Sequence, residues 1–250
     1  MVDETGRRPV EAPAWYAGKA GGWRDWVRVL HPPYTAWHLG YVLVGAGLAP
    51  AVSVRRLLAT LLAFGLAVGI AAHGFDELRG RPLRTAIPSR LLGAVSAVAL
   101  AGAIALGVAG IRRVGWGLGG FVAAGVILVL AYNLELLGGR LHTGAVFALG
   151  WGAFPVLTAY YAQTGTVRLA AVVGAAFAYG LSAAQRALSA EARDLRRRVS
   201  EVDGCKHYLD GSRVALTRRS LLAPIEKALM ALSWSTCALG VALVLARTGH

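Results

Sequence analysis

Residues 91–111 read LLGAVSAVALAGAIALGVAGI, an apolar run without a charged side chain. A helix needs about 20 such residues to cross the hydrocarbon core of a bilayer. Comparable runs, each with few charges, lie at 34–53, 57–75, 114–134, 143–161, 167–185 and 224–246. The sequence therefore predicts an all-α protein, a polytopic transmembrane helix bundle of about seven spans.

The composition supports a place in the lipid bilayer. Only 16% of residues are charged and 56% are hydrophobic, whereas about a quarter of a soluble domain is charged. The net charge of +13 is a property shared with nucleic-acid binders. Here the basic residues fall in connections between apolar runs, so we expect no nucleic-acid partner. The two cysteines, Cys205 and Cys237, indicate no disulfide framework.

The distribution of basic residues predicts how the chain crosses the membrane. Nineteen Lys and Arg side chains lie in the N-terminal segment and the even-numbered connections, against six on the other side. Because cytoplasmic loops are enriched in Lys and Arg, we expect a multi-pass protein of the cell inner (plasma) membrane with a cytoplasmic N-terminus. The expected organisation is a cytoplasmic segment, 1–33, with an interfacial helix at 14–30, then a transmembrane domain, 34–250. Its two long cytoplasmic loops are 76–90 and 186–223.

The end of the second apolar run carries the most informative polar residues. His73, Asp76 and Glu77 are spaced to share one helix face, and Arg79, Arg81 and Arg84 follow. Ionisable groups at membrane depth are costly and usually functional. Carboxylates beside guanidiniums suit a magnesium-bound diphosphate. A solvated loop with local salt bridges is the alternative interpretation.

This segment resembles the first aspartate-rich loop of the UbiA prenyltransferase superfamily. That loop reads Asn-Asp-x-x-Asp-x-x-x-Asp and is followed by an Arg-Pro…Ile-Pro-Ser stretch. Asp76 matches the central aspartate, and Arg81-Pro82 and Ile87-Pro88-Ser89 match the stretch that follows. The chain departs from the pattern at Ala72, His73 and Gly80, where the family has Asn and two Asp residues.

Two further segments extend the resemblance to roughly residues 28–200. Ala131-Tyr132-Asn133 is similar to the end of the family's fourth span, and Gly152–Gly165 is similar to the branch that prenylates dihydroxynaphthoate. The family's second acidic motif has its nearest candidates in Glu191 and Asp194; a basic amphipathic helix on the membrane surface is the alternative there. The family has nine spans, so either two are lost or another protomer closes the bundle as a homo-oligomer.

The resemblance implies a transferase that moves a prenyl group from a prenyl diphosphate to an aromatic or other lipid acceptor, with Mg²⁺. It implies catalytic roles for Asp76 and Tyr132. The residues expected to bind diphosphate are Arg79, Arg81, Arg84 and Arg140; those expected to bind metal are His73, Asp76, Glu77, Glu191 and Asp194. Asn133 and Glu135 are expected to line the substrate pocket.

Two other functions stay open on the sequence. A divergent relative could be a terpene cyclase, which ionises the same diphosphate without an aromatic acceptor, or a degenerate lipid-binding protein. The incomplete acidic motifs favour this alternative. A small transporter or accessory membrane subunit would instead require His73, Asp76 and Glu77 to face a continuous water path.

Overall fold

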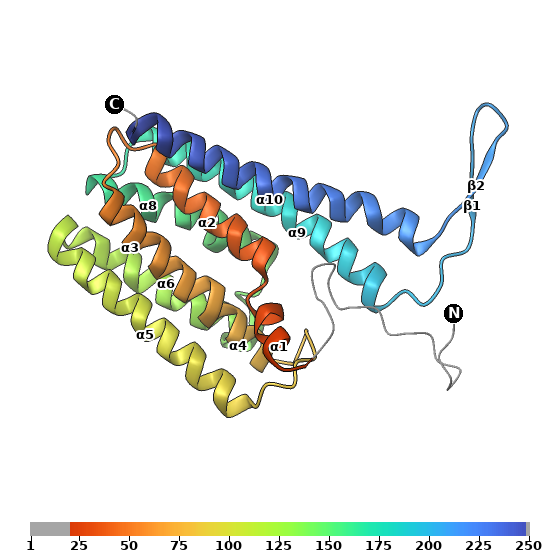
Figure 1. Cartoon of the computed structure of the whole chain (residues 1–250), viewed down its shortest axis with the longest axis horizontal. Helices are drawn as coiled ribbons and strands as arrows, with labels where there is room; N and C mark the ends of the chain where they lie inside the picture. Colours follow the sequence, from red (N-terminus) through yellow and green to blue (C-terminus); the bar gives the residue numbers. More distant parts are fainter. Residues whose placement is uncertain (1–20, 249–250) are drawn as a thin grey trace.

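The computed structural model describes residues 21–248, which form an all-α bundle with one small β-hairpin (Figure 1). In chain order the helices are α1 (Trp23–Val29), α2 (Pro32–Gly47), α3 (Val54–Phe64), η1 (Gly65–Ala72), α4 (His73–Leu78), α5 (Ser89–Val114), α6 (Gly117–Asn133), η2 (Leu137–Gly139), α7 (Gly144–Phe147), η3 (Ala148–Ala153), α8 (Phe154–Thr164), α9 (Leu169–Arg197) and α10 (Arg218–Thr248). The hairpin strands are β1 (Cys205–His207) and β2 (Arg213–Ala215).

Helices occupy all seven positions where the sequence predicts spans, and the predicted helical membrane bundle is confirmed. Four helical stretches are long and apolar enough to cross a membrane: Val54–Leu78, Ser89–Val114, Gly144–Thr164 and Arg218–Thr248. The apolar helix α6 has 17 residues and α2 has 16, so both are shorter than a typical span. The first predicted span, 34–53, ends early, because α2 stops at Gly47 ahead of Pro50.

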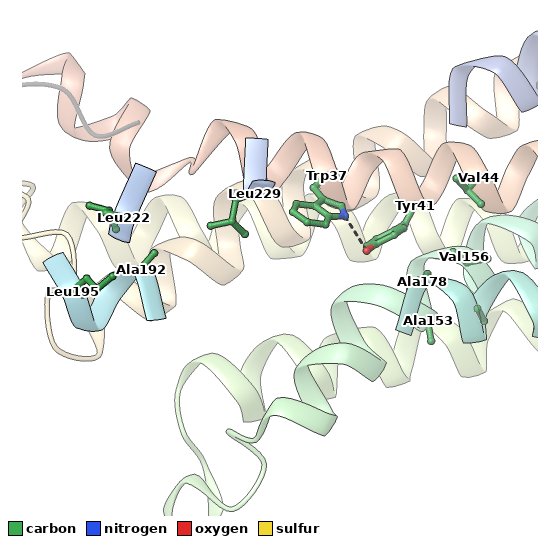
Figure 2. Packing of buried hydrophobic residues seen from close by; sticks show 11 residues of the cluster. Trp37, Tyr41, Val44, Ala153, Val156, Ala178, Ala192, Leu195, Leu222 and Leu229 are labelled. Carbon is green, nitrogen blue, oxygen red and sulfur yellow. Dashed lines mark hydrogen bonds between the residues drawn. The ribbon is translucent and has the colours of Figure 1, made fainter. Parts of the chain in front are cut away.

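Helices α2 and α10 pack side by side, and α2 also packs against α8 (Figure 1). A Cβ at Gly45 would collide with the Val156 backbone, and one at Gly47 would collide with Leu243. Small residues at such positions let helix backbones approach closely. The adjoining core contains Trp37, whose indole N–H donates a 2.8 Å hydrogen bond to the Tyr41 hydroxyl (Figure 2).

Two of the long helices contain a π-helical stretch, η1 and η3. Such wider turns are found mostly as local insertions, frequently at functional sites. Here η1 leads directly into His73 and Asp76, and η3 carries Trp151. Both stretches therefore set the direction of side chains at the same end of the bundle.

The polar connections contain more regular structure than the sequence predicts. The expected loop at 186–223 comprises the end of α9, the hairpin and the start of α10, and the hairpin projects beyond the bundle (Figure 1). The expected loop at 76–90 begins inside α4 and ends inside α5. Of the expected interfacial helix, residues 14–20 lie outside the described part; α1 covers Trp23–Val29 and buries Asp25 and Arg28.

Candidate functional site

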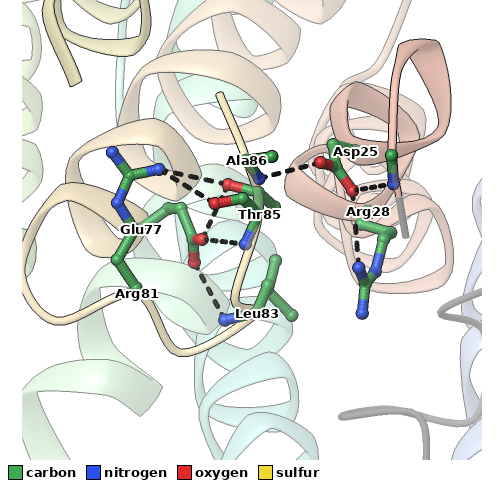
Figure 3. A network of polar contacts seen from close by, with 8 residues as sticks. Asp25, Arg28, Glu77, Arg81, Leu83, Thr85 and Ala86 are labelled. Atoms are coloured by element: carbon green, nitrogen blue, oxygen red, sulfur yellow. Dashed lines mark hydrogen bonds and ion pairs between the residues drawn. The ribbon is translucent and has the colours of Figure 1, made fainter. Parts of the chain in front are cut away.

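The loop at 79–88 is folded around the carboxylate of Glu77 (Figure 3). Glu77 is fully buried and accepts hydrogen bonds from the backbone N–H groups of Leu83 and Thr85, each 2.9 Å, and from the Thr85 hydroxyl at 2.8 Å. Both of its oxygens are therefore engaged. Although the sequence suggests Glu77 as a metal ligand, its contacts make it the organiser of the loop.

Arg81 completes the same network. Its guanidinium donates to the Ile87 carbonyl at 2.7 Å, to the Ser89 hydroxyl at 2.6 Å and to Thr85 at 3.3 Å. Arg81 and Arg84 both adopt left-handed backbone, with φ of 54° and 55°, which is unfavourable for residues other than glycine. The hydrogen bonds of Glu77 and Arg81 offset that strain, so the Arg-Pro…Ile-Pro-Ser stretch has a structural role here.

Helix α1 is fastened to the outside of this loop. The Asp25 carboxylate accepts a 2.9 Å hydrogen bond from the Ala86 N–H and one from Arg28 at 3.4 Å (Figure 3). Burial raises the pKa of Asp25, but hydrogen bonds from Gly21, Ala86 and Arg28 outweigh it, so the pKa lies below its ordinary value. The charged form of Asp25 therefore holds α1 against the loop.

With Glu77 turned into the loop, Asp76 is the carboxylate of this segment that faces the bundle. It is half-buried and interacts electrostatically with His142 and with Arg193 of α9. One turn earlier, the His73 ring lies 4.5 Å from the His31 ring, and its Nδ1 is 3.3 Å from the Gly69 carbonyl oxygen. Because η1 ends directly before His73, it positions His73 and Asp76 on one side of the site.

Tyr132 lies opposite, at the end of α6, inside an aromatic cluster. Its ring stacks on His142 at 4.3 Å between centroids and contacts Trp151 at 4.5 Å. The side chain is 4% exposed, yet its hydroxyl has no hydrogen-bond partner within the described structure. Buried polar groups are nearly always paired, so this hydroxyl points to a bound ligand.

The third wall is a face of α9 that carries two arginines. Arg186 and Arg193, seven residues and two helical turns apart, both interact electrostatically with Tyr132. The Arg186 guanidinium lies over the Phe147 ring, 5.3 Å from its centroid. Burial, followed by repulsion from Arg186, lowers the pKa of Arg193 below its ordinary value. Together with the carboxylates of Asp76 and Glu135, these two guanidiniums act on Tyr132, and they provide the donors for an anionic ligand.

The other residues that the sequence singles out lie around this site with different environments. Arg79 and Glu135 form an exposed ion pair at 3.6 Å, and Asn133 is buried with its amide donating to the Val129 carbonyl at 2.8 Å. Glu191 is exposed, and Asp194 pairs with Arg198 on the outer side of α9. Arg84 and Arg140 are exposed on their loops.

Sequence reasoning missed Arg186, Arg193, His142 and Trp151. A signal for α9 was present: Ser182, Gln185, Ser189 and the two arginines recur at the spacing of one helix face. The three uncharged members are buried, and the Gln185 side-chain oxygen has no partner in the described structure. No comparable signal marks His142 and Trp151, which reach Tyr132 only through tertiary packing.

The donor set fits one weakly held divalent ion. Within residues 21–248 no three His, Cys, Asp or Glu side chains form a group able to hold a metal on their own. A magnesium ion, however, often uses one or two carboxylates and takes its remaining ligands from water and substrate phosphate. Asp76 meets that requirement, whereas Glu191 is exposed and Asp194 is paired with Arg198.

Comparisons with known proteins give one similarity of fold. The structure of a UbiA homolog from Archaeoglobus fulgidus bound to Cd²⁺ matches with a TM-score of 0.47 and 16% sequence identity. The match covers 90% of this chain and 89% of that one. No family model matches the sequence. No curated protein matches it either.

Proposed function

We propose that this protein is a membrane-embedded, prenyltransferase-like protein of the UbiA type that binds an allylic prenyl diphosphate at the site between α4, α6 and α9. The observation that carries the proposal is the unpartnered Tyr132 hydroxyl, buried beside Asp76 and two guanidiniums at the mouth of an apolar bundle. The sequence resemblance at Asp76–Ser89 supports the same assignment.

In this proposal Arg186 and Arg193 bind the diphosphate oxygens, because planar guanidiniums form strong charge-assisted hydrogen bonds to phosphate. The Tyr132 hydroxyl donates to a further oxygen. The apolar prenyl chain lies among the helices, starting at the aromatic cluster of Phe147 and Trp151. The charged diphosphate of the ligand thereby contacts the arginines, and its hydrocarbon chain contacts the apolar helices.

The reaction that fits this arrangement is ionisation of the allylic diphosphate. The bond between the prenyl carbon and the diphosphate oxygen breaks, and its electron pair leaves with the diphosphate. Aromatic faces around Tyr132 stabilise the resulting cation, and the apolar side chains of Phe147 and Trp151 beside it lower the access of water. A carbon of an electron-rich acceptor ring attacks the cation and then loses a proton. A magnesium ion held by Asp76 would neutralise charge on the leaving group.

The arginines on α9 favour one alternative, a relative that binds the diphosphate without transferring its prenyl group. In the family pattern this helix contributes carboxylates for a second ion, whereas here the facing side chains are Arg186 and Arg193. Such a protein would be a terpene cyclase or a lipid-binding protein.

The test uses the purified full chain in lipid nanodiscs with magnesium, a prenyl diphosphate and an aromatic acceptor. We expect binding of the prenyl diphosphate and release of diphosphate. We expect Asp76→Asn to abolish release, while the matched control Asp194→Asn, a carboxylate paired on the outer side of α9, keeps it. A prenylated acceptor supports transfer, a hydrocarbon product supports cyclisation, and binding without release supports the lipid-binding alternative.

The binding part is tested separately. Arg186→Gln combined with Arg193→Gln should weaken prenyl diphosphate binding at least about tenfold, since each lost guanidinium–phosphate contact is a charge-assisted hydrogen bond. Arg198→Gln, at the exposed residue that follows the end of α9, should leave prenyl diphosphate binding unchanged. A wild-type protein that binds no prenyl diphosphate would contradict the whole proposal.

A further inference from the structure

The bundle contains an apolar cavity that borders the site just described at Trp151 and extends away from it. Its volume is about 240 Å³, and it lies between α3, α5, α6 and α8. Small and aliphatic side chains such as Ala63, Ala103 and Val122 form most of its wall. An apolar cavity of about 150 Å³ is already large enough to admit benzene, so this one has room for part of a hydrocarbon chain.

The cavity is elongated along the helices. Its lining runs from Arg55 to Val68 on α3 and η1, and from Arg113 back to Leu100 on α5. Fourteen residues of helix in each wall correspond to about 20 Å at 1.5 Å per residue. One leaflet contributes about half of a 30 Å hydrocarbon core, or about 15 Å. The cavity is therefore long enough for an acyl chain that enters from one leaflet.

The mouth of the cavity is positively charged. Arg55, Arg56 and Arg113 line it. Arg56 also joins the helix ends, since its guanidinium donates to the Gln163 carbonyl at 2.8 Å and to the Arg113 carbonyl at 3.2 Å. We call this end of the bundle the arginine end; its basic residues are Arg55, Arg56, Arg112, Arg113, Arg168 and Arg247.

Within residues 21–248, no acidic side chain lies at this end to balance these charges. Every Asp and Glu among residues 21–248 lies at the opposite end of the bundle or in the connections beyond it. Arg55 and Arg113 are exposed where their helices begin and end. An anion is therefore the group that complements the mouth, and a phosphate suits guanidiniums particularly well.

A polar group also lies below the mouth. Thr158, on α8, is 9% exposed and lines the cavity, and its hydroxyl has no hydrogen-bond partner within residues 21–248. It is six residues from the end of α8, about 9 Å along the helix. The ester oxygens of a glycerolipid lie just beneath its phosphate, at a depth comparable with that of Thr158.

We propose that the cavity binds an anionic glycerophospholipid from the leaflet at the arginine end, with an acyl chain between α3, α5 and α6 and its phosphate at Arg55 and Arg113. The acyl chain fills the apolar length, the phosphate neutralises the mouth, and the ester region meets Thr158. The proposal does not depend on the reaction at the opposite end.

The test measures lipid retention by native mass spectrometry on the delipidated full chain, supplied with phosphatidylglycerol or with phosphatidylcholine. We expect one phosphatidylglycerol to be retained at least about tenfold more strongly, given the electrostatic gain from each nearby arginine. Arg55→Gln combined with Arg113→Gln should remove that preference. Arg112→Gln combined with Arg168→Gln removes the same charge from the same end, but outside the cavity. This pair should preserve the preference for phosphatidylglycerol.

A second pair of variants tests the acyl chain. Ala103→Phe fills the cavity and should abolish retention of phosphatidylglycerol. Ala105→Phe adds the same bulk on an exposed face of α5 and should not. Equal retention by the two phenylalanine variants, or by the two arginine pairs, would overturn the proposal. Displacement of phosphatidylglycerol by a prenyl diphosphate or by a free fatty acid would also overturn it, by assigning the cavity to another ligand.

Discussion

At Tyr132 a buried hydroxyl lies among aromatic rings, and none of residues 21–248 forms a hydrogen bond with it. Leaving such a group unpaired costs about 1–3 kcal/mol. We therefore expect Tyr132→Phe to keep or slightly raise the melting temperature of the ligand-free protein. The same variant should weaken prenyl diphosphate binding about tenfold, because it removes a donor to a charged ligand.

Tyr41→Phe is the matched control for that experiment. The Tyr41 hydroxyl is also buried, but it bonds Trp37 at 2.8 Å and Ser182 at 3.1 Å. Its removal should lower the melting temperature and leave binding unchanged. If Tyr132→Phe behaved like Tyr41→Phe, the hydroxyl of Tyr132 would have a structural partner rather than a ligand.

The carboxylate of Glu77 supports its loop through three donors. An amide offers one acceptor oxygen in place of two, so Glu77→Gln should lower the free energy of unfolding by about 1–3 kcal/mol. Thermal unfolding in detergent measures this loss, and limited proteolysis should show earlier cleavage within 79–88. Glu191→Gln, an exposed carboxylate on α9, should have little effect. Equal stability of the two variants would contradict the role of Glu77.

At the scale of elements, the contact between η3 and α9 determines where Arg186 and Arg193 lie. A Cβ at Gly152 would come within 2.5 Å of the Ala178 carbonyl oxygen. Gly152→Ala should therefore push α9 outward, lower stability by about 1–3 kcal/mol, and weaken binding of a prenyl diphosphate. Melting temperature and a binding titration measure the two effects.

Gly180→Ala on α9 provides the comparison, because nothing lies within 4 Å of a Cβ at Gly180. Alanine favours a helix over glycine by up to about 1 kcal/mol, so this variant should be neutral or more stable. If the Gly152→Ala protein matched the Gly180→Ala protein in stability and in prenyl diphosphate binding, the close approach of η3 and α9 would be dispensable.

At the scale of the whole molecule, the acidic side chains of residues 21–248 lie at one end and only basic ones lie at the other. With the positive-inside rule, we predict that the hairpin is cytoplasmic. Cys205 is exposed on β1, so in a Cys237→Ala background an impermeant maleimide should label it only after the membrane is opened. A cysteine introduced at exposed Trp116, in place of Cys205, should be labelled in intact cells. The reverse pattern would invert the topology.

The sequence singled out Asp76 and Tyr132 as candidate site residues, and in the fold these two side chains interact electrostatically. It assigned Glu77 to metal because one helix face holds Glu77 and Asp76, and helical spacing cannot show that a later loop folds back onto one of them. On α9 it singled out Glu191 and Asp194, whereas the packing of α9 turns Arg186 and Arg193 toward Tyr132. These differences arise from contacts between distant segments of the chain, which the periodicity within one helix cannot predict.

By itself, the sequence determined that this chain is a helical membrane protein, because long apolar runs separated by basic connections have few other stable arrangements in a bilayer. Only the tertiary structure decided which polar groups meet. The orientation of α9 against η3, the hydrogen bonds that turn Glu77 into its loop, and the isolation of the Tyr132 hydroxyl each depend on segments far apart in the chain. Their positions follow from packing between helices, which residue spacing within one helix does not specify.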